Sequence, residues 1–171
     1  MDSPPPKKSK TVHASSWKVM MTFFFDCKGP LLIDFLEYDT TTNVQRYVKT
    51  LNKLKRTIKS KCLGMLTKGM ILLHDNAFPH IAHDVATTLH KFHWEVLKHP
   101  PYGPDLSPCQ DYHIFGALKE DLRGRQFASN SELQSWIQLG FHRQPQTFLH
   151  DGIDHLVSQW DKYINSYGYY F

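Results

Sequence analysis

Apolar and polar positions occur in blocks along this chain, and the blocks predict a mixed α/β fold. Residues 17–25 are rich in aromatic and other strand-forming residues, and a second apolar run occupies residues 31–38. Between them lies Asp26-Cys-Lys-Gly29, in which glycine can adopt a positive φ. These residues therefore predict a β-hairpin. Pro30 has no N–H to donate, so we expect it at the start or the edge of the second strand.

The next block has the periodicity of a helix. Asn43 can cap its first turn, and apolar residues then recur at intervals of three and four positions: Val44, Tyr47, Val48, Leu51, Leu54 and Ile58. The basic residues between them fall mostly off this face. The block predicts an amphipathic helix with a basic, solvated outer surface.

A short apolar run at residues 70–73 ends abruptly in His74, Asp75 and Asn76. A helix should begin at Pro79, with a buried side formed by Ile81, Val85, Leu89 and Phe92, and residues 94–97 form another short strand. Strand, helix and strand in this order predict a parallel βαβ unit. Asp75 would then lie at the carboxyl end of a buried strand, at the rim of the sheet.

The remaining sequence predicts helices. Residues 99–108 contain four prolines and form a non-helical loop, after which a helix should carry Asp111 in its first turn and stop near Gly124. Ser129-Asn-Ser-Glu132 matches a capping box at the start of another helix. A last helix is expected over about 153–165, with an inward side formed by Leu156, Val157, Trp160, Tyr163 and Ile164.

Composition narrows the class of protein. Hydrophobic residues make up 41% of the 171 residues, enough for a real core, and the net charge of +4 is compatible with a polyanionic partner. No apolar run is long enough to span a membrane, and the N-terminus is polar. We expect a protein of the nucleus or cytoplasm that is neither secreted nor membrane-bound. Residues 1–16 should form a flexible basic arm with Lys7, Lys8 and Lys10.

Asp75 and Asp111 are the candidate catalytic and metal-binding residues. Carboxylates on neighbouring elements of an α/β sheet are the hard oxygen ligands that Mg²⁺ or Mn²⁺ prefers. Such ions can activate a hydroxyl and stabilise a phosphoryl transition state. Structural roles remain open for both residues, because acidic residues are common at strand ends and in the first turn of helices.

Several motifs, in the same order and with nearly the same gaps, resemble the mariner family of DNA transposases. They are His74-Asp-Asn-Ala77, residues 99–108, Asp111-Tyr-His-Ile-Phe115, Leu122-Arg-Gly-Arg-Gln-Phe127 and Trp160-Asp-Lys-Tyr-Ile-Asn165. The resemblance covers essentially the whole chain from about Ser3.

The resemblance implies an RNase-H-like mixed sheet flanked by helices, DNA as the partner, a homodimer, and Mg²⁺- or Mn²⁺-dependent DNA cleavage and strand transfer. In that family three aspartates hold the metal ions, and the second and third match Asp75 and Asp111. Four residues are expected as neighbours of this site: His74, Asn76, His80 and His113. Residues 1–16 resemble the family's inter-subunit loop, 17–125 a partial catalytic core, and 126–171 the C-terminal helices.

Departures from the family pattern predict that this chain is a truncated or decayed copy, inactive by itself. The first aspartate and the central strand that carries it would lie upstream of residue 1. One extra residue separates Asp75 from Asp111, and Phe78 stands where the family usually has arginine.

Two alternatives remain open from the sequence. The chain could be a domesticated, non-catalytic module that binds nucleic acid or protein, for which the arm lysines, the basic helix, Arg123 and Arg125 are candidate contacts. It could also be a free-standing nuclease in which another acid replaces the missing one. Asp34 is the candidate for that role, although its place in the strand predicts a solvent-facing side chain.

Overall fold

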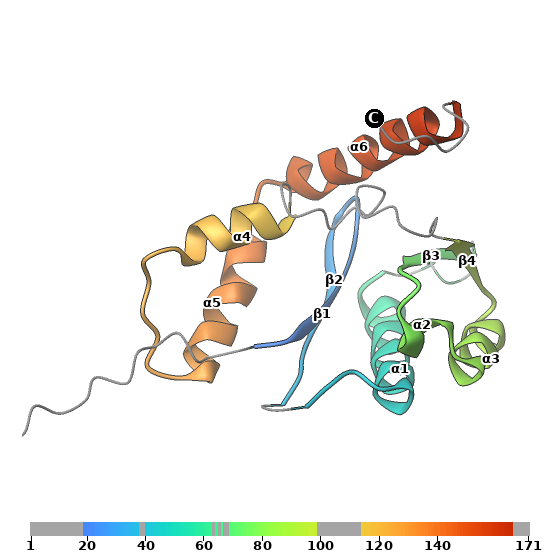
Figure 1. Ribbon diagram of the computed structural model, residues 1–171, viewed down its shortest axis with the longest axis horizontal. Helices are drawn as coiled ribbons and strands as arrows, with labels where there is room; N and C mark the ends of the chain where they lie inside the picture. Colours follow the sequence, from blue (N-terminus) through green and yellow to red (C-terminus); the bar gives the residue numbers. More distant parts are fainter. Residues whose placement is uncertain are drawn as a thin grey trace, which may run out of the picture.

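The computed structural model describes residues 19–37, 40–62, 64, 66, 69–98 and 114–165, and they form a mixed α/β structure (Figure 1). Its elements in chain order are β1 (Met21–Asp26), β2 (Gly29–Phe35), α1 (Val44–Lys61), β3 (Met70–His74), α2 (Phe78–Ile81), α3 (His83–Phe92), β4 (Trp94–Lys98), α4 (Ile114–Leu122), α5 (Asn130–Arg143) and α6 (Gln146–Asn165).

The predicted hairpin is confirmed, with shorter strands than the sequence suggested. β1 and β2 are antiparallel, from the pair Met21 and Phe35 to the pair Asp26 and Gly29. Asp26 Oδ1 accepts hydrogen bonds from the backbone N–H of Lys28 at 2.8 Å and of Gly29 at 3.0 Å, which closes the turn. Pro30 lies at the start of β2, where the register shifts and no ladder donor is needed.

The βαβ unit is also confirmed, but its single predicted helix is two helices. β3 and β4 pair in parallel. Between them Ala82 adopts an extended conformation, with ψ of 149°, and separates α2 from α3. The break resets the helical phase, so Ile81 is 60% exposed and the expectation that it is buried was wrong, whereas Val85 and Leu89 are buried.

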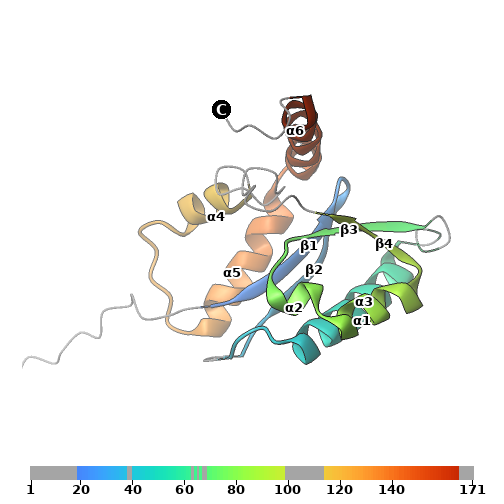
Figure 2. The same cartoon turned by 45° about the vertical axis from the view of Figure 1, so that its right-hand side comes forward.

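Two apolar cores lie on opposite faces of the hairpin. The first joins α1, α3 and the β3–β4 sheet through Tyr47, Leu51, Leu54, Ile58, Leu72, Val85, Leu89 and Trp94. The second joins the helices after residue 113 through Ile114, Ile137, Phe141 and Leu149. Because side chains alternate along a strand, Phe24 packs on the first core and Phe23 on the second. Figure 2 shows the hairpin between α5 and the pair of α1 and α3.

The two sheets remain separate. Among the described residues each has only two strands, and β1–β2 does not pair with β3–β4. Ile71 of β3 is 65% exposed and Leu97 of β4 is 40% exposed. Among the described residues, each strand of these sheets therefore pairs along one edge only.

Among the C-terminal helices, α5 begins at its predicted cap. Ser129 Oγ accepts a hydrogen bond from the N–H of Glu132 at 3.2 Å, and Glu132 Oε2 accepts one from the N–H of Ala128 at 2.7 Å, which confirms the capping motif. α6 begins at Gln146, several residues before the predicted start.

The inward face predicted for α6 is only partly right. Leu149 and Leu156 are buried, but Val157 is 57% and Ile164 is 65% exposed. Only the first turns of α6 contribute to the second core, and the rest of the helix projects past the hairpin (Figure 1). Within the described residues, no helix has both the length and the apolar character needed to cross a membrane.

Candidate metal centre around Asp75

Asp75 follows β3 directly, and its side chain is 65% exposed. Its Oδ1 accepts two hydrogen bonds, from the backbone N–H of Ala77 at 3.0 Å and from His80 Nδ1 at 2.5 Å. No described residue bonds Oδ2. One oxygen is therefore used to orient the carboxylate, and the other faces outward.

Asp75 is ionised at neutral pH. Partial burial by itself would raise the pKa of its carboxyl group, but the hydrogen bond from Ala77, the charge and hydrogen bond of His80, and the charge of His74 outweigh burial and lower the pKa. The geometry thus presents a negatively charged oxygen at the end of a strand.

The aromatic rings of Tyr47, His74 and His80 pack together next to this carboxylate. Tyr47 of α1 shares a hydrogen bond with His74, with 3.0 Å between Oη and Nδ1. The ring of His80 lies 4.1 Å from the ring of Tyr47 and 5.4 Å from that of His74, centroid to centroid, and the two imidazoles are nearly parallel. Side chains from α1 and β3 therefore hold the ring of His80 in α2, and His80 in turn holds Asp75.

The rings closest to the core are neutral at pH 7. Burial, and then the charge of His80, lower the pKa of His74 to about 4, although Asp75 acts in the opposite direction. Burial, and then the charge of Asp75, raise the pKa of Tyr47. His74 is therefore uncharged at neutral pH, and its charge acts on the pKa of Asp75 only near pH 4, where His74 takes up a proton.

The structure brings together three of the residues predicted to neighbour the site. His80 bonds Asp75, His74 stacks beside His80, and Asn76 is the exposed residue that follows Asp75. Phe78, in the place of the family's usual arginine, is 76% exposed at the start of α2. Tyr47 was missed as a site residue, because its position on the apolar face of α1 indicated only a core role.

Other predicted site residues lie elsewhere. Asp111, His113, Lys7, Lys8 and Lys10 fall outside the described residues. Arg123 and Arg125 follow α4, on the far side of the hairpin from α2 (Figure 1). Arg123 pairs with Glu120 at 2.7 Å, and Arg125 approaches Asp121 at 3.5 Å.

Asp34 is not solvent-facing, contrary to the expectation from the sequence. It is 7% exposed, because its side chain points from β2 toward α1, where two donors meet it. Thr50 Oγ1 donates to Oδ2 at 2.7 Å, and Lys53 Nζ donates to Oδ1 at 2.7 Å. Burial would raise its pKa, but these hydrogen bonds and the charges of Lys53 and Arg46 lower it. With both oxygens engaged, Asp34 is a structural residue.

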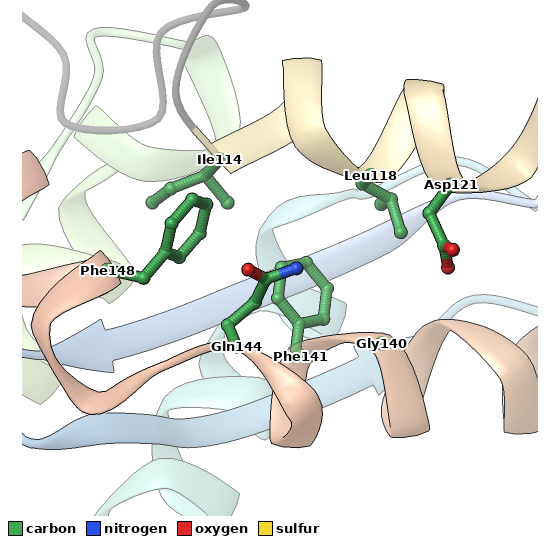
Figure 3. A pocket seen from close by; sticks show the side chains of 7 residues that line it. All are labelled: Ile114, Leu118, Asp121, Gly140, Phe141, Gln144 and Phe148. Atoms are coloured by element: carbon green, nitrogen blue, oxygen red, sulfur yellow. The ribbon is translucent and has the colours of Figure 1, made fainter.

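In the part of the chain that the structure describes, the surroundings of Asp75 included, no group of three or more His, Cys, Asp or Glu side chains is arranged to hold an ion. Figure 3 shows a small crevice between α4 and α5, lined by Ile114, Leu118, Asp121, Gly140, Phe141, Gln144 and Phe148. Its lining is mostly apolar, so it belongs to the second core rather than to a reaction centre.

Comparison with known proteins decides the family. The family described as Transposase (partial DDE domain) matches residues 1–68. A crystal structure of the catalytic domain of Mos1 mariner transposase matches with a TM-score of 0.83 and 33% identity, over 90% of this chain and 76% of that chain. This chain belongs to the mariner transposase family. Its fold is accordingly RNase-H-like.

Curated members of the mariner family extend well beyond this chain. The Mariner Mos1 transposase of Drosophila mauritiana is 34% identical over 155 residues, which cover 90% of this chain and 45% of that protein. Histone-lysine N-methyltransferase SETMAR of Homo sapiens is 34% identical over 155 residues, 90% of this chain and 22% of that protein. The chain therefore spans less than half the length of either relative.

Mos1 has also been solved with metal and with transposon ends. The Mos1 mariner paired end complex with Mn matches with a TM-score of 0.83 and 32% identity, over 99% of this chain and 48% of that chain. The Mos1 catalytic domain has likewise been solved with Mn and with Mg. Divalent metal use and DNA assembly are therefore features of this mariner relative.

Proposed function

We propose that this mariner-family chain contributes Asp75 and Asp111 to a divalent-metal centre for phosphoryl transfer on DNA, and that the 171-residue chain does not cleave DNA alone. The observation that carries the proposal is the geometry of Asp75. Its Oδ1 is held by Ala77 and His80, and its Oδ2 has no partner among the described residues.

Asp75 is a suitable ligand for Mg²⁺ or Mn²⁺. Asp75 offers an ionised, exposed, hard oxygen, which is the kind of ligand these ions prefer. When bound, such an ion supplies positive charge that stabilises a phosphoryl transition state. Ala77 and His80 hold the carboxylate in one orientation, and the ring stack of Tyr47 and His74 limits the movement of His80.

Asp111 enters this proposal through its place in the mariner motif. In that motif it would supply the second carboxylate of the centre, three residues before α4 begins at Ile114. His113 would be its neighbour. Two carboxylates can hold an ion weakly, but placing two ions about 3.5–4 Å apart for in-line displacement requires a further ligand.

The partners follow from the same family membership. Because Mos1 assembles on paired transposon ends, we propose DNA as the partner of this chain, and a second copy of the chain bound through the arm at residues 1–16. The nucleus is the compartment in which such a partner is met. Residues 17–125 would be the core that holds the metal, and residues 126–171 the helices that cover the hairpin.

Two measurements test the metal centre. In a supercoiled-plasmid assay with Mg²⁺ or Mn²⁺, the chain should produce no more nicking than its Asp75→Asn variant. In a Mn²⁺ titration followed by electron paramagnetic resonance, weak binding should be lost in Asp75→Asn and kept in Asp161→Asn, which removes an exposed carboxylate from α6.

The two parts of the proposal fail separately. Robust nicking that vanishes in Asp75→Asn would show that the chain is an active nuclease. Mn²⁺ binding that is the same in wild type, Asp75→Asn and Asp161→Asn would remove Asp75 from the metal centre. Circular dichroism of each variant checks that the fold is retained.

A non-catalytic nucleic-acid-binding role is the second candidate, and α1 favours it. Its outer face carries Lys49, Arg56, Lys59 and Lys61, all exposed. A basic face of this kind attracts phosphate backbones without reading sequence. DNA binding that Lys59→Gln and Lys61→Gln weaken, in a chain that binds no Mn²⁺, would support this role.

A further inference from the structure

Trp136 of α5 is a fixed aromatic platform on the opposite side of the hairpin from Asp75. Its indole Nε1 donates a hydrogen bond to Asp121 Oδ2 at 2.7 Å, which ties α5 to the end of α4. Phe127 lies 6.5 Å away, ring centroid to ring centroid. Figure 3 shows Asp121 pointing from α4 toward α5 near Gly140. The indole is held on two sides and cannot rotate freely.

Two guanidinium groups lie over this one ring. The Cζ atom of Arg125 is 4.1 Å and that of Arg143 is 5.3 Å from the ring centroid. Both arginines are exposed, and the side chain of Arg125 keeps 45% of its surface accessible. Stacking on an aromatic face fixes the plane of a guanidinium and leaves its outer N–H groups free to bond a ligand. We call Arg125, Trp136 and Arg143 the Trp136 cluster.

The cluster keeps a net positive charge, because among the described residues Asp121 pairs with Arg125 and no carboxylate pairs with Arg143. Arg125 Nε donates to the backbone oxygen of Asp121 at 2.6 Å, and its NH2 group reaches Asp121 Oδ1 at only 3.5 Å. Asp121 Oδ2 is already taken by Trp136. Among the described residues, no carboxylate lies within ion-pair distance of Arg143.

The other acidic side chains of this region are engaged elsewhere. Glu120 pairs with Arg123 at 2.7 Å, and Glu132 Oε2 accepts the hydrogen bond from Ala128 that caps α5. The carboxylate of Asp121 thus offsets the charge of Arg125, and the positive charge of Arg143 stays without an ion-pair partner among the described residues. This arrangement is suited to an external anion that can accept several N–H bonds at once.

We propose that the Trp136 cluster binds phosphodiester groups of a nucleic-acid backbone. The inference rests on the proposed function, which makes DNA the partner, and it names residues for that contact. The planar fork of arginine matches two phosphate oxygens, and each phosphate carries one negative charge. The guanidinium groups already lie over the indole and compete with any base that would stack there, so the contact is to the backbone and independent of sequence.

The cluster and Asp75 are spatially separate. Figure 1 places the end of α4 and α5 on one side of the hairpin, and α2 on the other. Contact at the cluster would hold DNA without touching the metal centre, so the two can be tested independently.

Fluorescence anisotropy of a labelled random-sequence duplex, titrated with the chain at several NaCl concentrations, tests the proposal. Arg143→Gln and Arg125→Gln should each weaken binding and reduce the slope of log K against log salt by about 0.9, the value for one lost phosphate contact. Lys28→Gln, in the hairpin turn, removes the same charge from an exposed position and should leave the slope unchanged.

A conservative variant separates charge from geometry. Arg143→Lys keeps the charge but loses the planar fork, so its salt slope should match the wild type while its affinity falls between wild type and Arg143→Gln. Thermal melts confirm that each variant folds. Equal effects of Arg143→Gln, Arg125→Gln and Lys28→Gln would overturn the proposal, as would salt-independent binding by the wild type. Because Mn²⁺ binding is measured without DNA, failure here leaves the test of Asp75 intact.

Discussion

Replacing Asp34 with alanine should destabilise the fold without affecting the candidate metal centre. The carboxylate is nearly fully buried, and it joins β2 to α1 through Thr50 and Lys53. Removing it leaves the buried hydroxyl of Thr50 without its acceptor and releases Lys53 into solvent. These two losses differ in size because the two partners differ in exposure.

The hydrogen bond from Thr50 is the larger contribution. A buried hydrogen bond to a charged group contributes about 1.5–3 kcal/mol, whereas an ion pair with an exposed partner contributes about 0–1 kcal/mol. Lys53 is 53% exposed, so its pair belongs to the second class. We therefore expect Asp34→Ala to lower the free energy of unfolding by about 2–4 kcal/mol and Tm by about 4–16 °C for a chain of this length.

Urea unfolding followed by circular dichroism measures this loss, and a double-mutant cycle assigns it. Thr50→Val removes the hydroxyl with little change in shape, so the cycle of Asp34→Ala and Thr50→Val should give a coupling of about 1–2 kcal/mol. Because the folded-state pKa of Asp34 is lowered, its contribution is present above pH 3.8 and is lost as pH falls below that value. The free energy of unfolding of Asp34→Ala should therefore fall less steeply than that of the wild type as pH decreases below 3.8.

A cost below about 0.5 kcal/mol for Asp34→Ala would show that the carboxylate does not hold β2 against α1, since surface substitutions fall in that range. A coupling indistinguishable from zero would show that Thr50 and Asp34 do not act as a pair. Loss of Mn²⁺ binding in a folded Asp34→Ala chain would restore Asp34 as a metal ligand.

Two further predictions concern His74 and the faces of β3. The folded-state pKa of His74 is lowered to about 4, so the unfolded chain takes up the proton first as pH falls. The free energy of unfolding should therefore fall by up to about 3 kcal/mol between pH 6.5 and 4. Urea melts of His74→Gln should lack this pH-dependent loss of stability. A parallel pH dependence in both chains would contradict this. Leu72 is 6% and Ile71 is 65% exposed, so Leu72→Ala should cost about 2–4 kcal/mol in chemical unfolding and Ile71→Thr less than about 0.5 kcal/mol. Equal costs would mean that both faces of β3 are covered.

Local patterns predicted most of the elements. The hairpin turn, the Asn43 cap, the apolar face of α1 and the capping motif at Ser129 depend on residues within a few positions of one another, and all are found in the structure. Asn43 Oδ1, for example, accepts the N–H of Arg46 at 2.8 Å. Such features depend on backbone geometry and side-chain chemistry that short sequences contain.

Errors arose where distant residues decide burial. Asp34 was expected in solvent because its own strand gives no sign of Thr50 and Lys53, which meet it from another element. Ile164 was expected inside because helical periodicity marks an apolar face but does not show where the packing partner ends. Ala82 breaks a helix that periodicity continues, and no local motif signals that break.

The sequence by itself determined the order of elements, the mariner resemblance and the position of Asp75 at the end of a strand, since each depends on residue identity and spacing. Only the tertiary structure decided which oxygen of Asp75 is held, that Tyr47 belongs to its support, and that Trp136 carries two arginines. Those facts depend on side chains from α1, α2, α4 and α5 meeting across the fold. Their contacts follow from how the helices pack on the hairpin, and packing is a property of the whole chain.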